Sequence, residues 1–512
     1  MLADHPADLP LFESSLLLDD KQSPLSRANQ EPVQLIPSRK PEPGEQYRFH
    51  FNMEKCIGCK CCVVACNQQN GNPADILWRR VGEIEGGVYP FTQRHYLSMG
   101  CNHCVEPTCL PACPVKAYTK DLTTGVVLHD ADTCIGCQYC TWNCSYGVPQ
   151  YNPERGVIGK CDLCHNRLAD DMAPACADAC PEQAITIELV NVEQWRKDYA
   201  NANAPGMPSA DDSLSTTRIT LPANLPTDMD RVDTMQLRPE HAHSPLVLML
   251  VLTQMSVGAF TCLWLLNRSG AAAHETLLAL ISLVLAAISL GASTLHLGRP
   301  AFAWRALRAL KTSWLSREVL MLSLFAGIAS AYAGLLLTGS PQHSLAGMLT
   351  AISGVAGVFC SARIYIVLAR PAWNSGLTIA DFFSTAFVLG PLLLRPFGFD
   401  DNHALANAAV TGAVTQLVVQ GLRLGWLSFS NIYELRGCAQ LQLNHFRDAF
   451  VVRFVLLILG GIVLPMTSAS EWSAIAALTL ALASELISRW LFFVTVVPKN
   501  IGMSFVAGGH KL

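Results

Sequence analysis

The sequence predicts two dissimilar parts: an α+β domain rich in cysteine, followed by an all-α bundle of eight transmembrane helices. The first observation is that sixteen of the twenty cysteines form four groups between Cys56 and Cys180. The second is that, after Pro245, eight apolar runs are long enough to cross a bilayer, which takes roughly 20 residues each. The third is a composition that is 51% hydrophobic although the chain before Pro245 is largely polar.

In the last cysteine group eleven residues separate Cys164 from Cys176, and each of the other three groups has three close thiols followed by a fourth. Such a group can hold three corners of an iron–sulfur cube and send its last sulfur to a neighbouring cube. Four groups therefore predict four [4Fe–4S] clusters. The groups are Cys56, Cys59, Cys62 and Cys66; Cys101, Cys104, Cys109 and Cys113; Cys134, Cys137, Cys140 and Cys144; and Cys161, Cys164, Cys176 and Cys180.

Two other uses of cysteine fit the pattern less well. Structural zinc usually takes two separated Cys-x-x-Cys pairs for each ion, whereas these cysteines come in groups of four. Disulfides need an oxidising compartment, and nothing in this sequence indicates one. Cys61 falls in a gap between ligand positions and is interpreted as a bystander.

The cysteine groups are joined by short alternating segments that predict strands at 47–51 and 184–190, and a hairpin over 117–128 that turns at Gly125. A domain with so little conventional core is expected to be ferredoxin-like, with the clusters as its interior. The predicted organisation is a disordered tail (1–46), the four-cluster domain (47–195), a proline-rich linker (196–244), the eight-span anchor (245–497) and a C-terminal tail (498–512).

Basic residues flank the predicted spans unevenly. Twelve lie on the side of the cluster domain and two, Arg268 and Arg395, on the other, so the positive-inside rule places the clusters in the cytoplasm. We also expect neither a secretory nor a twin-arginine signal at Met1–Asp8, which has no basic region before an apolar run. The twelve are Arg231, Arg238, Arg299, Arg305, Arg308, Lys311, Arg317, Arg370, Arg436, Arg447, Lys499 and Lys511.

Eight spans exceed what a simple anchor needs, so the bundle is expected to bind a quinone. Ionisable residues within spans are candidate functional sites. His296 closes the second span on the cluster side and can hydrogen-bond a quinone carbonyl. Glu485 and Arg489, four residues apart, are interpreted as an ion pair between helices. The candidate quinone residues are His296, Arg299, Arg317, Glu318 and Asp381.

The histidines suggest how electrons would reach that quinone. A pair of haems b needs axial histidines well within the spans, whereas His274, His343, His403 and His445 fall at edges or in loops. We therefore predict no haem. The quinone, menaquinone or ubiquinone, must then lie close enough to a cluster for direct electron transfer.

The four cysteine groups resemble the electron-transfer subunit of dimethyl sulfoxide reductase and other molybdopterin oxidoreductases. Residues 245–497, with His296-Leu-Gly-Arg-Pro300, are similar to the haem-free membrane anchor subunit of the same complexes, so the chain looks like a fusion of the two. In the family the first and fourth groups share two clusters, and the second and third share the others. The resemblance implies four ligand sets: Cys56, Cys59, Cys62 and Cys180; Cys66, Cys161, Cys164 and Cys176; Cys101, Cys104, Cys109 and Cys144; and Cys113, Cys134, Cys137 and Cys140.

The resemblance implies a non-catalytic subunit that connects a molybdopterin catalytic partner to the quinone pool in the inner (cytoplasmic) membrane. The leading expectation is quinol oxidation of the dimethyl sulfoxide reductase type, in anaerobic respiration. The cytoplasmic side expected for the clusters also fits a sulfite-oxidising complex that reduces quinone. Two other hypotheses are a membrane redox sensor or scaffold, and an enzyme that links soluble ferredoxin to quinone. A net charge of −4 gives no reason to expect nucleic acid.

Overall fold

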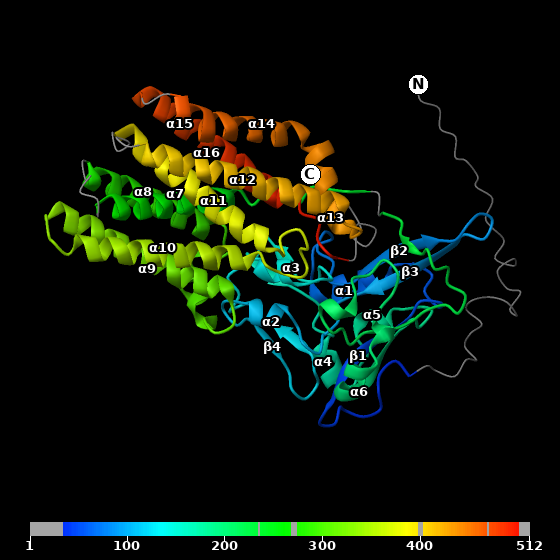
Figure 1. Ribbon diagram of the computed structural model, residues 1–512. Helices are drawn as coiled ribbons and strands as arrows, with labels where there is room; N and C mark the ends of the chain where they lie inside the picture. The colour runs from blue at the N-terminus through cyan, green and yellow to red at the C-terminus, as the bar shows by residue number, and fades with distance from the viewer. Residues whose placement is uncertain (1–33, 234–235, 268–273, 398–402, 468–469, 501–512) are drawn as a thin grey trace, which may run out of the picture.

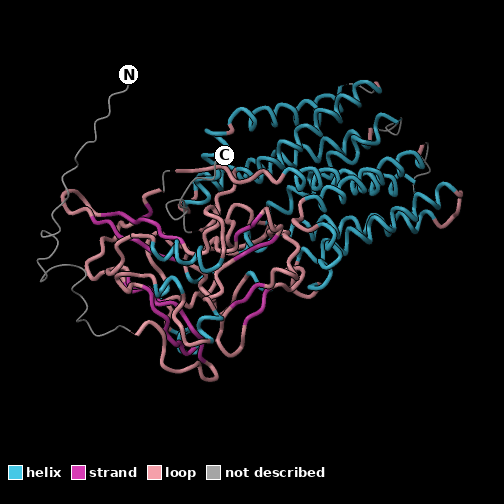
Figure 2. The backbone as a smooth tube through the Cα atoms, turned by 180° about the vertical axis from the view of Figure 1, so that it is seen from behind, coloured by secondary structure: helices cyan, strands magenta, loops and turns pink. Residues whose placement is uncertain are grey.

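The computed structural model describes residues 34–233, 236–267, 274–397, 403–467 and 470–500. The chain forms two parts in succession: a cysteine-rich domain of short strands and helices, and a bundle of long helices (Figure 1). Seen from behind, the strands all lie in the first part, and the long helices run side by side in the second (Figure 2). This arrangement confirms the predicted α+β domain followed by an all-α bundle.

The cysteine-rich domain is built from small sheets and short helices. Its strands are β1 (Glu45–Asn52), β2 (Arg80–Gly86), β3 (Gln93–Met99), β4 (Tyr118–Lys120), β5 (Val127–His129), β6 (Gln150–Asn152), β7 (Val157–Gly159), β8 (Ile185–Asn191), β9 (Arg218–Thr220) and β10 (Asp230–Arg231). Its helices are α1 (Cys61–Asn70), α2 (Cys109–Ala112), α3 (Tyr139–Asn143), α4 (His165–Ala169), α5 (Ala175–Asp178) and α6 (Val192–Lys197).

The main sheet has the strand order β8-β1-β9. Strands β1 and β8 are antiparallel, with Phe49 opposite Ile187, and both side chains are buried. Cysteine side chains from the first and fourth groups pack in the same apolar core as these residues, including Cys62, Cys161 and Cys176. Most side chains of this core are nevertheless ordinary apolar ones, so the domain has more conventional core than the sequence predicts.

The segment predicted to be a linker takes part in this domain. Its β9 pairs in parallel with β1, and its β10 pairs antiparallel with β2. Of the predicted N-terminal tail, residues 1–33 lie outside the described residues. Beyond them, the carbonyl oxygen of Leu35 accepts a hydrogen bond from the Ile187 amide at 2.8 Å, so the described end of this tail lies against the sheet.

Among the described residues, the bundle contains eight helices that are long and apolar enough to cross a membrane, which agrees with the predicted number and with a multi-pass membrane protein. The short α13 (Tyr433–Gln440) connects two of them. The eight are α7 (Ser244–Asn267), α8 (Glu275–Leu295), α9 (Trp314–Leu337), α10 (His343–Ile364), α11 (Gly376–Leu394), α12 (Ala404–Phe429), α14 (Arg447–Ile458) continued through a π-helical turn into α15 (Leu464–Thr467), and α16 (Glu471–Val494).

Helix α7 is central to the bundle and packs against α8, α10, α11 and α16. It crosses α11 where two glycines face each other: a Cβ on Gly390 would lie 2.4 Å from the carbonyl carbon of Gly258. Small residues let helix backbones approach closely in a membrane. Close packing matters there because burial of apolar side chains contributes little to helix association in lipid.

The two parts meet in a backbone-to-backbone contact. The loop after α8 lies on the loop that carries Cys137, and the Arg299 amide donates to the Ile135 carbonyl at 3.1 Å. Three glycines make this approach close enough: a Cβ on Gly298 would lie 2.2 Å from the Gly156 oxygen, and one on Gly136 would lie 2.3 Å from the same atom. The junction therefore places one cysteine group directly against the bundle.

Candidate functional site

The structure brings the sixteen cysteines together in the four sets that the family resemblance implies. In the first set, burial and the neighbouring thiols of Cys62, Cys180 and Cys59 raise the pKa of Cys56 to about 11. In each of the other sets, burial and the three remaining thiols likewise raise the pKa of one member. Those members are Cys66 beside Cys161, Cys176 and Cys164; Cys109 beside Cys144, Cys101 and Cys104; and Cys140 beside Cys137, Cys113 and Cys134.

The geometry of these sets fits iron–sulfur cubes. The first and third sets each line a cavity, and every cysteine is a free thiol. Among the described side chains, no three His, Cys, Asp or Glu are placed to share one metal ion. A cube of four irons instead takes one thiolate at each corner. Cys61, predicted to be a bystander, is exposed and belongs to none of the sets.

Two buried cationic side chains lie between the cysteine sets, and neither was predicted from the sequence. Arg79 is buried beside Cys62 and Cys66, which belong to different sets, and donates to the Ser98 carbonyl at 3.3 Å. Lys160 is buried near Cys101 and donates to the Cys161 carbonyl at 2.8 Å. Buried positive charge of this kind favours the thiolate form of a ligand and tunes the potential of a cluster. The position of Arg79 between two cysteine groups is the only signal the sequence offers.

A cavity of about 420 Å³ lies at the junction of the two parts. Its wall from the cysteine-rich domain includes Cys137, Tyr139 and Trp142, and its wall from the bundle includes His296 and Glu318. The remaining lining is mostly apolar, from helices α7, α8, α9 and α10 and the 3-10 helix Pro300–Ala309. A largely apolar pocket with a few convergent polar groups is typical of a small-molecule site.

Two of the candidate quinone residues face this cavity. The His296 ring hydrogen-bonds the backbone of Cys137, and its buried Nε2 has no partner among the described residues. Burial, and then the nearby His241, lower the pKa of His296 to about 4. Glu318, near the start of α9, is only 6% exposed. Together they offer one ring nitrogen and one carboxyl group to a molecule in the cavity.

The other three candidates lie elsewhere. Arg299 donates to the Ala131 carbonyl at 2.9 Å and so holds the two parts together. Arg317 donates to the carbonyls of Leu310 and Lys311, and its guanidinium lies over the Trp314 ring. Neither side chain lines the cavity, because each is directed toward backbone carbonyls of a neighbouring loop.

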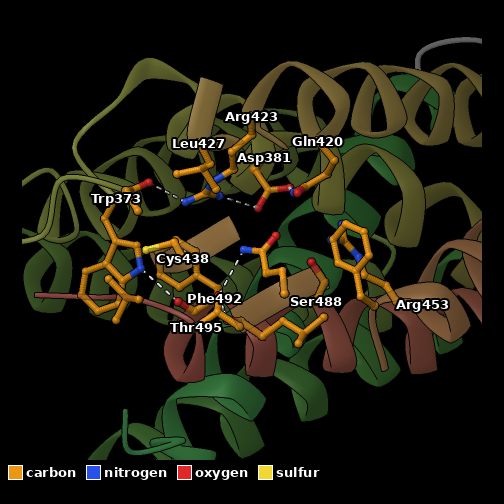
Figure 3. A pocket seen from close by; sticks show the side chains of 15 residues that line it. Trp373, Asp381, Gln420, Arg423, Leu427, Cys438, Arg453, Ser488, Phe492 and Thr495 are labelled. Atoms are coloured by element: carbon orange, nitrogen blue, oxygen red, sulfur yellow. Dashed lines mark hydrogen bonds and ion pairs between the residues drawn. The ribbon is translucent and has the colours of Figure 1, made fainter. Parts of the chain in front are cut away.

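Asp381 belongs to a separate buried ionic cluster between α11, α12, α14 and α16 (Figure 3). Arg489 donates to its carboxylate at 2.6 Å. The predicted ion pair of Arg489 with Glu485 is therefore wrong. Arg489 pairs with Asp381 from α11, and Glu485 instead accepts hydrogen bonds from Thr385 and Gln416. A partner on a neighbouring helix was closer than the residue one turn away.

Comparison with known proteins agrees with both parts. Residues 92–189 match the family model described as a 4Fe-4S dicluster domain, and residues 240–494 match the DMSO reductase anchor subunit (DmsC). One relative is a component of the anaerobic dimethyl sulfoxide reductase of Haemophilus influenzae. It is 34% identical over 177 residues, which cover 33% of this chain and 85% of that protein.

Two further relatives cover the same region. A component of the anaerobic dimethyl sulfoxide reductase of Escherichia coli K12 is 36% identical over 167 residues, or 31% of this chain and 80% of that protein. A component of the sulfite dehydrogenase of Allochromatium vinosum is 36% identical over 160 residues, or 27% of this chain and 67% of that protein.

The fold and these matches define a membrane-anchored iron–sulfur protein of the electron-transfer class. More particularly, the chain belongs to the dimethyl sulfoxide reductase family and is a fusion of two of its subunits. Its N-terminal part is of the iron–sulfur electron-transfer type, and its C-terminal part is of the anchor type.

Proposed function

We propose that this chain carries electrons between the quinone pool and a molybdopterin-containing catalytic partner. Four [4Fe–4S] clusters, held by the four cysteine sets described above, form the route, and the terminal substrate reacts on the partner. The proposed direction is quinol oxidation of the dimethyl sulfoxide reductase type. The family of the chain supports the partner, and the grouping of the thiols supports the number of clusters.

One observation carries the quinone part of the proposal: Cys137 and His296 line the same cavity. A quinone there would have an apolar pocket for its ring and tail, a hydrogen-bonding nitrogen from His296 and a carboxyl group from Glu318. It would also touch the protein shell of the nearest cluster. Electrons could then pass directly, without a haem between quinone and cluster.

The orientation is proposed from charge. The junction cavity lies where the bundle meets the cysteine-rich domain, on the side to which the sequence assigns twelve of the fourteen flanking basic residues counted above. Because cytoplasmic loops carry the excess of Lys and Arg, the proposal places the clusters and the quinone cavity at the cytoplasmic face of the inner membrane.

A second candidate is the same subunit role in a sulfite-oxidising complex, with electrons flowing to quinone. It is favoured by the sulfite dehydrogenase relative, which is as similar to this chain as the relative from Escherichia coli K12. An assay of the purified complex decides between the two. Sulfite-dependent reduction of quinone supports this second candidate, and oxidation of quinol by dimethyl sulfoxide supports the first.

The test of the quinone site compares His296→Gln and Glu318→Gln with Arg317→Gln as a control outside the cavity. We expect the first two to slow cluster reduction by a quinol by about tenfold or more, because each removes a hydrogen-bonding or charged partner of the quinone. Dithionite should still reduce all clusters. Cluster absorbance and electron paramagnetic resonance measure both reactions. Unchanged quinol kinetics in His296→Gln would contradict the proposal.

A further inference from the structure

The buried ionic cluster that contains Asp381 is not balanced in charge. Five charged side chains of this cluster are each less than a tenth exposed: Asp381, Glu485, Arg423, Arg453 and Arg489. Three of them carry a guanidinium, which is always charged in proteins, and two carry a carboxylate. At least one positive charge is therefore left over in a region that excludes water. Charges inside a membrane bundle are normally paired.

Four of the five have partners. Asp381 accepts from Arg489 at 2.6 Å and from the Gln420 amide at 2.6 Å, and Arg423 lies 4.0 Å from it. Arg423 also donates to the Ala372 carbonyl at 2.8 Å. Glu485 accepts from the Thr385 hydroxyl at 2.8 Å and from the Gln416 amide at 3.0 Å.

Arg453 is the exception. It is 3% exposed, and its buried Nε and Nη2 atoms have no hydrogen-bond partner among the described residues. The side chain borders a cavity that is also lined by Arg423, Asp381, Gln420 and Ser488, so two guanidinium groups and one carboxylate face it (Figure 3). A buried cation with unsatisfied donors is costly unless something accepts from it.

The cavity beside Arg453 has room for one small guest. Its free space is about 20 Å³, and a single water-sized guest needs about 10–15 Å³. A lipid headgroup or a quinone would not fit. We propose that this cavity binds one small monovalent anion of the halide type, chloride in the cell, which accepts from Arg453 and neutralises the surplus charge of the cluster.

The bound anion would also support the wall of the junction cavity. The guanidinium of Arg489 lies 4.3 Å from the Phe382 ring centre, and that of Arg423 lies 5.3 Å from the Phe492 ring centre. Both rings contact Tyr365, at 5.5 Å and 5.2 Å between ring centres, and Tyr365 lines the junction cavity. The anion site itself stands whether or not that cavity binds quinone.

The experiment uses the full chain in mild detergent. Chloride is replaced by gluconate at constant ionic strength, and thermal unfolding is followed by tryptophan fluorescence. We expect the melting temperature to fall by a few degrees without chloride, to recover along a saturating curve as chloride is added back, and to recover with bromide as well, because a ligand that binds only the folded state stabilises it. Equilibrium dialysis with radioactive chloride should find one bound ion per chain.

Variants locate the site. Arg453→Met removes the surplus charge and should abolish both the bound chloride and the chloride dependence of the melting temperature. Arg447→Met, an exposed position on the same helix, should keep both. If Arg453→Met does not fold, Ser488→Ala serves instead and should raise the half-saturating chloride concentration about tenfold by removing a donor from the cavity. No bound chloride in the wild-type chain, or chloride dependence that survives in Arg453→Met, would overturn the proposal and leave water as the occupant.

Discussion

At the scale of single residues, the junction depends on positions where a side chain is excluded. Gly298 meets Gly156 so closely that any Cβ would strike the carbonyl oxygen. Gly136 and Gly156 also have φ near +69° and +65°, a region that L side chains rarely adopt. The contact between these glycines, which holds the loop of Cys137 against the bundle beside the junction cavity, is therefore made by backbone atoms.

We expect Gly298→Ala to separate the two parts and to slow cluster reduction by quinol about tenfold, because electron tunnelling weakens steeply with distance. All clusters should still assemble and accept electrons from dithionite. Gly291→Ala is the matched control: an added Cβ there meets nothing within 4 Å, and alanine favours a helix. Stopped-flow absorbance measures the rates of cluster reduction by quinol and by dithionite. A Gly298→Ala chain that quinol reduces at the wild-type rate would contradict this expectation.

Glu188 shows how one charge can hold a sheet together. It lies on β8 and accepts from Arg48 at 2.8 Å and His50 at 2.9 Å, both on the adjoining strand β1, and from Arg218 at 3.2 Å, on β9 at the far side of β1. Partial burial acts to raise the pKa of Glu188, but the hydrogen bond from His50 and the charges around it outweigh burial and hold the pKa at about 2. The carboxylate is thus ionised at any physiological pH.

Glu188→Gln should destabilise the cysteine-rich domain by about 2 kcal/mol at pH 7. The folded pKa lies below the ordinary value of 4.5, so the contribution is complete above about pH 4.5 and is lost as the pH falls toward about 2. The gap in melting temperature between variant and wild type should therefore narrow in acid. Glu85→Gln, from an exposed pair with Arg94, should change little. A gap that stays constant with pH would argue against the charge network.

At the scale of elements, the five-residue helix α3 connects the cysteine sets to the helical bundle. Cys140 lies within it and Cys144 follows it, in different ligand sets. Its Trp142 is buried among aromatic rings of the bundle, with ring centres 5.5 Å from Trp373 and 5.6 Å from Tyr365. One short helix thus positions thiols of two sets and also packs the domain against the membrane part.

Trp142→Ala should cost about 3–5 kcal/mol, because a large buried side chain is lost and its neighbours cannot close the space. We expect the junction to loosen, so that protease cleaves the chain between the two parts. Trp142→Phe should retain most of the packing and serve as the control. Limited proteolysis in detergent reports the result, and equal resistance of Trp142→Ala and wild type would contradict it.

At the scale of the whole molecule, the two parts have different interiors. The bundle packs one large apolar core from its own helices, whereas the cysteine-rich domain packs thiols into its smaller apolar core. If clusters fill the space between those thiols, binding them and folding the domain are the same event. The bundle has no such requirement.

Removing the iron with ferricyanide and a chelator should therefore unfold the cysteine-rich domain and leave the bundle helical. Circular dichroism at 222 nm should fall only in part, while protease digests residues 47–195 and spares a fragment of the size of the bundle. Apo protein as resistant to protease as the holo form would show that the domain has a sufficient core without its clusters.

Local patterns in the sequence were enough for much of this structure. Apolar runs predicted eight spans, alternating apolar and polar residues predicted strands β1 and β8, and cysteine spacing predicted clusters. Each of these signals lies within one short segment of the chain. Other features depend on segments far apart in the chain. Only the family resemblance could suggest that Cys180 joins Cys56, since spacing carries no information on which loops meet.

The rotation of each helix about its own axis also could not be predicted from the sequence. His296 was the leading candidate and Arg317 and Asp381 were further ones, all as ionisable residues in or beside a span. Packing turns only His296 of these three toward the junction cavity and places Asp381 against Arg489. The sequence by itself determined the two-part architecture and the kind of cofactor. Only the tertiary structure decided which thiols, which histidine and which cavity come together, because those meetings depend on how separate elements pack.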